Sequence, residues 1–152
     1  MAVPDEDYPN TKLLPLRPIG IQALNDPKFE SLYKSKFSFF NPIQTQVFHT
    51  LFHTDNNVLV GAPTGSGKTI MSEFAMLRVF AKTPKKKVIY IAPLKALAKE
   101  RIIDWKLRLG GKDLQKSVLE LTGDCTPDLA ALKDADLLIT TPEKWDGISR
   151  NW

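Results

Sequence analysis

The segment from Ala62 to Thr69 has the residue types and spacing of a phosphate-binding loop. It fits the pattern G-x-x-x-x-G-K-[ST], with Ala62 at the first glycine position. Two glycines let the backbone curl, so that successive N–H groups point toward one centre. The lysine can then reach the outer phosphates of a nucleotide, and the threonine hydroxyl can ligate Mg²⁺. We therefore predict binding of ATP and Mg²⁺ by Ala62, Pro63, Thr64, Gly65, Ser66, Gly67, Lys68 and Thr69.

The elements on either side of this loop are those that a phosphate loop requires. The apolar run 58–60 predicts a short strand before it. Apolar residues at 70, 74, 77 and 81 predict a helix after it, whose N-terminal dipole favours anions. The alternative is a glycine-rich strand-to-helix turn with a chance Lys-Thr pair, which this agreement of motif and context disfavours.

The rest of the chain alternates predicted helices and strands. Residues 88–91 form a continuous apolar run, typical of a strand buried on both faces of a parallel sheet. Further strands are predicted at 118–121 and 137–140, and helices at 42–53, near 95–109, near 127–133 and from Pro142. This order predicts an α/β fold with a parallel sheet covered by helices on both faces.

The first forty residues contain five prolines, at 4, 9, 15, 18 and 27. Proline fixes φ and removes a backbone donor, so this composition disfavours a long helix. We therefore predict an extended, proline-rich strap over residues 1–38, followed by the α/β domain over residues 39–152.

Composition excludes several classes of protein. The chain has 152 residues, of which 43% are hydrophobic and 25% charged, a normal globular balance. Its single cysteine, Cys125, cannot form an internal disulfide, which favours a reducing compartment such as the nucleus or cytoplasm. No apolar run reaches the length of a membrane span, and we expect no membrane partner.

The net charge of +4 is unevenly distributed. Residues 82–116 contain eleven basic and three acidic side chains. Such a segment indicates a phosphate-bearing partner, but it also fits a lysine-tipped loop and solvated helix faces. Charge alone favours the second interpretation.

Four segments, the first of which contains the loop, resemble the superfamily 2 DExH-box helicases, in particular the Ski-type group with two helicase cassettes. They are FNPIQTQVFHTLFHTDNNVLVGAPTGSGKT at 40–69, YIAPLKALAKER at 90–101, LTGD at 121–124 and TTPEKWDGISR at 140–150. The resemblance implies a RecA-like ATP-binding lobe, ATP hydrolysis that involves Lys68, and unwinding of nucleic acid. The sequence does not distinguish RNA from DNA.

The resemblance also assigns residues outside the loop. Gln44 matches the glutamine that reads the adenine edge, although a polar position on the helix 42–53 is the alternative. The positions that match nucleic-acid motifs are Pro93, Lys95, Gly123, Thr141, Pro142 and Glu143. Lys95 shares a helical face with Lys99 and Lys106, so these lysines either contact a nucleic-acid backbone or lie along the apolar stripe. Thr141 is a natural N-cap for the last helix.

The DExH motif and the second motor lobe of the family do not occur in the sequence. We therefore expect the lobe to be incomplete at its C-terminus and this chain to be inactive by itself. The expected partners are a single strand of RNA or DNA and a larger assembly in ribonucleoprotein, repair or ribosome-quality-control processes. Alternatives are a module that binds nucleotide or nucleic acid without hydrolysis, and a small-molecule kinase, which has no need of TTPEKWD or Gln44.

Overall fold

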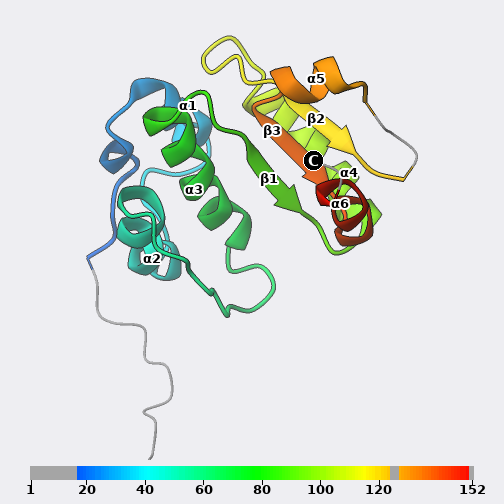
Figure 1. Ribbon diagram of the computed structural model, residues 1–152. Helices are drawn as coiled ribbons and strands as arrows, with labels where there is room; N and C mark the ends of the chain where they lie inside the picture. The colour runs from blue at the N-terminus through cyan, green and yellow to red at the C-terminus, as the bar shows by residue number, and fades with distance from the viewer. Residues whose placement is uncertain (1–16, 124–126, 151–152) are drawn as a thin grey trace, which may run out of the picture.

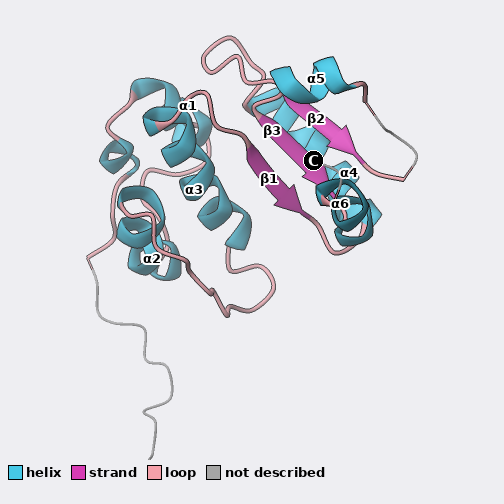
Figure 2. Cartoon of the chain, viewed as in Figure 1, coloured by secondary structure: helices cyan, strands magenta, loops and turns pink. Residues whose placement is uncertain are grey.

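The computed structural model describes residues 17–123 and 127–150. Figures 1 and 2 show a sheet with the helices of the N-terminal part of the chain beside it. In chain order the elements are η1 (Ile21–Leu24), α1 (Pro27–Lys34), α2 (Pro42–His53), α3 (Lys68–Lys82), β1 (Val88–Ile91), α4 (Lys95–Arg108), β2 (Val118–Leu121), α5 (Leu129–Asp134), β3 (Leu137–Thr140) and α6 (Pro142–Ser149). None of the described helices is both long enough and apolar enough to cross a bilayer.

The sheet is parallel, with the order β1-β3-β2. The central strand β3 is completely buried, and its side chains alternate between two apolar clusters. Leu137 and Ile139 pack in one cluster with residues of α4, whereas Leu138 packs in the other with Leu132 of α5. The predicted α/β fold, with helices on both faces of a parallel sheet, is therefore confirmed.

The N-terminal region is not extended throughout, and the predicted strap is wrong for residues 21–34. Pro27 occupies the first turn of α1, where its missing N–H costs nothing, and the Asp26 carboxylate accepts from the backbone N–H of Lys28 at 2.8 Å. α1 then buries Phe29 and Tyr33 in the core. Proline therefore starts a helix here instead of preventing one. Residues 1–16 of the predicted strap lie outside the described residues.

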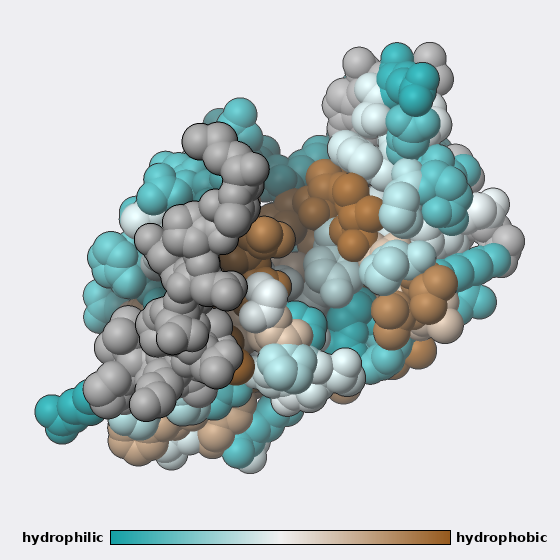
Figure 3. All heavy atoms as spheres, turned by 90° about the horizontal axis from the view of Figure 1, so that it is seen from below, coloured by the Kyte–Doolittle hydropathy of each residue, from teal (hydrophilic) through white to brown (hydrophobic). Residues whose placement is uncertain are grey.

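The predicted strand at 58–60 does not form, and Leu59 is 99% exposed. A strand requires a partner for its backbone groups, and in the described residues β1 pairs with β3 alone. A cavity of about 590 Å³ lies between Val58, Val60, α3 and β1, with Leu51, Met71 and Val79 in its lining. Seen from below, apolar atoms gather in a hollow of the molecule (Figure 3).

The strand β1 is also less buried than its apolar sequence predicts. It is an edge strand of the sheet, its first three residues are half-buried, and Ile91 is 44% exposed. Burial on both faces, which the apolar run 88–91 predicts, is therefore wrong for this strand.

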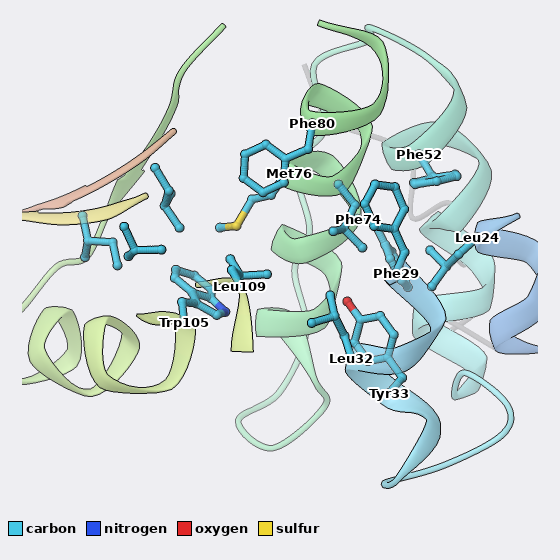
Figure 4. Packing of buried hydrophobic residues seen from close by; sticks show 14 of the residues in the cluster. Leu24, Phe29, Leu32, Tyr33, Phe52, Phe74, Met76, Phe80, Trp105 and Leu109 are labelled. Carbon is cyan, nitrogen blue, oxygen red and sulfur yellow. The ribbon is translucent and has the colours of Figure 1, made fainter. Parts of the chain in front are cut away.

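The described chain packs as two halves. The helical half, residues 17–82, holds α1, α2 and α3, and the sheet half, residues 88–150, holds the sheet with α4, α5 and α6. Figure 4 shows their contact, in which Trp105 and Leu109 lie against Met76 and Phe80 of α3. One apolar cluster runs through both halves, so they share a core.

Candidate nucleotide site and nucleic-acid edge

The loop before α3 has the backbone shape that phosphate binding needs. Gly65 and Gly67 have φ values of +81° and +84°, in the left-handed region that favours glycine. Gly67 is also the N-cap residue of α3, and its carbonyl oxygen accepts from the Ile70 N–H at 3.0 Å, whereas the N–H groups of Lys68 and Thr69 before it have no partner within the helix. The loop and the helix dipole thus present backbone donors and partial positive charge to one region.

Lys68 folds back over this loop. Its Nζ atom donates to the carbonyl oxygens of Ala62 at 2.6 Å and Pro63 at 2.7 Å. A phosphate oxygen is a stronger acceptor for an ammonium than a neutral carbonyl, so a bound phosphate would draw Lys68 away from these contacts. The Ser66 hydroxyl is buried and has no hydrogen-bond partner among the described residues, so it is a further polar group available in the loop.

The loop opens on a cavity of about 510 Å³ that also touches the sheet half. Thr64, Gly65, Gly67, Lys68 and Thr69 line one side of it. Its lining also includes Ser72 of α3 and four residues of the sheet half, Tyr90, Leu97, Glu100 and Arg101. A nucleotide polyphosphate requires hydrogen-bond donors and positive charge. The loop provides backbone N–H groups around left-handed glycines, a lysine, hydroxyl groups and a helix N-terminus, so the residues present fit this ligand. Thr69 lies in the first turn of α3, and its role as a ligand of Mg²⁺ stays a prediction.

Gln44 lies next to the loop but is engaged by the protein itself. Its side chain is part of a capping box at the start of α2, where Oε1 accepts from the backbone N–H of Asn41 at 3.0 Å. Its Nε2 donates to the carbonyl oxygen of Gly67 at 3.4 Å, and the residue is 4% exposed. Reading an adenine edge would therefore require Gln44 to exchange these partners, and the assignment of that role stays a prediction.

Sequence reasoning missed Asn41, which supports the loop directly. Its Nδ2 donates to the carbonyl oxygen of Ser66 at 3.0 Å, while its Oδ1 accepts from the backbone N–H of Gln44 at 2.9 Å. The spacing Asn-x-x-Gln is a capping-box signal that was available in the sequence. The cap of α2 thus holds the loop in place through both of its side chains.

The predicted nucleic-acid residues come together at one edge of the sheet. Pro93 and Lys95 follow β1, Gly123 follows β2, and Thr141, Pro142 and Glu143 follow β3. Because the three strands are parallel, all six residues lie beyond their carboxyl ends, which is where open α/β sheets bind ligands. All are exposed except Thr141, which is buried.

Thr141 occupies the N-cap position of α6, but its side chain does not cap the helix. Its hydroxyl instead donates to the Glu143 carboxylate at 2.6 Å, and this hydrogen bond lowers the pKa of Glu143. Thr141 is therefore the N-cap residue of α6, as predicted, but without a side-chain hydrogen bond to the helix. The Glu143 carboxylate lies at this helix N-terminus and accepts from the Thr141 hydroxyl. A phosphate at the same place would compete with Glu143 for that donor.

The basic segment 82–116 divides into structural and exposed cations. Lys87, Arg108 and Lys116 bond to groups of the fold, for example Lys116 to Asp136 at 3.0 Å. Lys95, Lys99 and Lys106 are exposed on α4. At 1.5 Å of rise per residue, Lys106 lies about 16 Å along the helix from Lys95, away from the carboxyl edge of the sheet. Only the first part of the lysine face therefore borders the predicted nucleic-acid edge.

We expect Gly67→Ala to weaken nucleotide binding about tenfold. Alanine is strained at φ +84°, by about 1–2 kcal/mol, and its Cβ would lie 2.3 Å from Gln44 Nε2. Calorimetric titration with Mg·AMPPNP measures the change. Gly61→Ala is the matched control, because a Cβ there meets nothing within 4 Å and the position needs no left-handed backbone. Equal affinities for the two variants would contradict the role given to the shape of the loop.

Comparison with known proteins agrees with this geometry. The family model for DEAD/DEAH box helicases matches residues 41–152. The whole chain is 60% identical to activating signal cointegrator 1 complex subunit 3 of Gallus gallus and 58% identical to that of Homo sapiens. It is also 60% identical to the DExH-box ATP-dependent RNA helicase DExH14 of Arabidopsis thaliana. In each case the chain spans about 7% of the relative's length.

The fold is also that of a solved helicase. The crystal structure of the DUF1998 helicase MrfA bound to DNA and AMPPNP matches 84% of this chain and 18% of that one, with a TM-score of 0.70 and 19% identity. The family model covers the loop, the sheet and all six positions at its carboxyl edge. This chain belongs to the DEAD/DEAH box helicase family.

Proposed function

We propose that this chain is the ATP-binding part of an ATP-dependent nucleic-acid helicase. The observation that carries the proposal is the loop itself, in which Gly65 and Gly67 have a left-handed backbone conformation. Lys68 lies over the loop carbonyl oxygens, and Thr69 lies in the first turn of α3. Family membership and the name of the plant relative, an ATP-dependent RNA helicase, support ATP as the nucleotide.

Each part of the loop would bind a different group of the nucleotide. The backbone of 63–67 and the N-terminus of α3 would hold the phosphates, and Lys68 would neutralise their outer charge. Thr69 would ligate Mg²⁺, which supplies charge neutralisation when bound. Asn41 and Gln44 keep the loop in shape from the cap of α2. Hydrolysis and unwinding would also need the DExH motif and the second motor lobe of the family, which these residues do not include.

The proposed partner is a single strand of nucleic acid at the carboxyl edge of the sheet. The exposed positions Pro93, Lys95, Gly123 and Pro142 support this location, together with the N-terminus of α6. The names of the relatives favour RNA and membership of a cointegrator-type complex, whereas the solved helicase MrfA holds DNA.

Direct binding tests the nucleotide part of the proposal. Calorimetry with AMPPNP should show one site whose affinity falls when Mg²⁺ is removed with EDTA. AMP, which lacks the phosphates that the loop would hold, should bind far more weakly. Equal binding of AMP and AMPPNP would refute a phosphate-binding role for the loop.

We expect Lys95→Ala to flatten the salt dependence of oligonucleotide binding. Loss of one phosphate contact lowers the log–log slope by roughly one unit. Fluorescence anisotropy with labelled single-stranded RNA and DNA, over a series of salt concentrations, measures the slope. Lys106→Ala is the control, because that residue lies on the same helix away from the edge. An unchanged slope for Lys95→Ala would favour packing along the apolar stripe over backbone contact.

A further inference from the structure

Glu73 is a buried carboxylate that the loop chemistry does not use. It lies on α3 one helical turn after Thr69 and is 1% exposed. Three side chains donate to it: the Tyr33 hydroxyl at 2.7 Å, the Trp105 indole at 2.8 Å and the Arg108 guanidinium at 2.6 and 3.1 Å. We call these four residues the Glu73 hub.

The hub connects the two halves of the molecule. Glu73 and Tyr33 belong to the helical half, whereas Trp105 and Arg108 lie in the last turns of α4 in the sheet half. α3 packs chiefly on α2, and α4 packs chiefly on β2 and β3, so each helix has its main neighbours in its own half. Another polar contact between the halves joins Ser31 to Asp113, but it is exposed. The hub is thus the buried polar joint between α3 and α4.

The contacts of the hub fix one arrangement of the four groups. The Arg108 guanidinium binds both oxygens of Glu73, also pairs with Asp104 at 3.0 Å, and lies 5.7 Å from the Tyr33 ring centre. A guanidinium fork of this kind demands a particular orientation, which a lysine cannot reproduce. Burial, and next the charge of Glu73, raises the pKa of the Tyr33 phenol well above its usual value, so Tyr33 stays a donor.

The two predicted ligand sites belong to the two helices that this joint connects and to the segments beside them: the phosphate loop leads into α3, and Lys95 begins α4. The phosphate loop opens α3 in the helical half, and the predicted nucleic-acid residues all lie in the sheet half. A cavity of about 530 Å³ is lined by residues of both helices, with Thr69 and Glu73 from α3 and Glu100, Asp104 and Arg108 from α4. A ligand that displaces Thr69 therefore acts one helical turn away from the Glu73 carboxylate, which binds Trp105 and Arg108 of α4.

We propose that Glu73 is a positioning residue that couples the nucleotide loop to the nucleic-acid edge by fixing α4 against α3. This inference rests on the proposed function, since it requires both ligands to bind. Coupling between two sites is a ratio of affinities, and it is the same whichever ligand is bound first. The hub determines how far one bound ligand changes the affinity of the other. The affinity of each ligand by itself depends on its own site.

The test measures this ratio in the full chain. The affinity of a fluorescein-labelled oligouridylate of about 12 nucleotides is determined with and without saturating Mg·AMPPNP. We expect a change of about fivefold or more in the native chain, and of twofold or less in Arg108→Lys. Arg108→Lys keeps the charge but loses the fork. Tyr33→Phe, which removes a single oxygen atom, should reduce the ratio as well, and it decides the test if Arg108→Lys does not fold.

Arg78→Lys is the matched control. Arg78 is also on α3 and also binds a carboxylate, that of Asp55 at 2.7 Å, but both partners belong to the helical half. We expect this variant to keep the native ratio. A native ratio in Arg108→Lys and Tyr33→Phe, or a ratio of one in a native chain that binds both ligands, would overturn the role of the hub. Failure of the native chain to bind Mg·AMPPNP would instead overturn the proposed function itself.

Discussion

Lys68→Ala should lose nucleotide binding almost completely, with an affinity for Mg·AMPPNP about 100-fold lower or beyond detection. Lys68 Nζ already lies over the loop, within 2.7 Å of two loop carbonyl oxygens, so the distance it must travel to a phosphate is small. Charge-assisted hydrogen bonds to phosphate are about twice as strong as neutral ones, and two of them are worth about 3 kcal/mol. Alanine removes them together with the positive charge.

The measurement is a calorimetric titration of both chains under the same salt conditions. Lys82→Ala is the matched control, because Lys82 is an exposed lysine in the last turn of the same helix. It lowers the net charge equally but lies far from the loop, and its affinity should stay within about twofold of native. If Lys68→Ala bound as tightly as Lys82→Ala, Lys68 would not be a phosphate ligand and the motif assignment would fail.

Local patterns in the sequence predicted the helices around the site well. The apolar stripe Ala98, Ile102, Trp105 and Leu109 is completely buried, as its helical spacing requires. The loop is placed by its glycines and by the helix that follows, and both signals are local. The family resemblance is confirmed by the match of residues 41–152 to the DEAD/DEAH box helicase model. The roles of single residues in binding stay predictions.

Features that depend on distant partners were not predictable in this way. The run 58–60 is apolar and short, as a strand should be, but whether it forms a ladder depends on a neighbour that no local pattern names. The five prolines of the first forty residues predict an extended strap without a long helix, although Asp26 before Pro27 is a helix start signal. The signal for this helix is therefore local, but the prediction rests on the number of prolines and not on the Asp-Pro start signal.

Glu73 shows the same limit most clearly. A glutamate within a helix of mixed composition is typical of a solvated face, and its neighbours in the sequence give no reason to bury it. Its partners lie 40, 32 and 35 residues away, at Tyr33, Trp105 and Arg108. Only the packing of α1 and α4 against α3 makes the position internal, so the hub becomes visible once the tertiary structure is known.

Glu73→Leu should destabilise the chain by about 3–5 kcal/mol, a large share of the stability of a domain of this size. Removal of the carboxylate leaves the buried Tyr33 hydroxyl and the buried Trp105 indole without an acceptor. Arg108 then keeps Asp104 as its carboxylate partner. Urea unfolding followed by circular dichroism measures the loss. Asp55→Leu is the control, because Asp55 also pairs with an arginine at 2.7 Å but is 94% exposed, and it should cost at most about 1 kcal/mol.

The double variant Glu73→Leu/Arg108→Leu separates the value of the ion pair from the cost of breaking it. A buried ion pair contributes little net stability, because desolvation of two charges offsets most of their attraction, whereas one unpaired charge is expensive. We therefore expect the double variant to regain more than half of the stability that Glu73→Leu loses, although the donors of Tyr33 and Trp105 stay unpaired. Such recovery would mean that the native pair is kept for the arrangement of α3 and α4 that it imposes, and not for stability. A double variant less stable than Glu73→Leu would show that Arg108 stabilises the fold independently of Glu73.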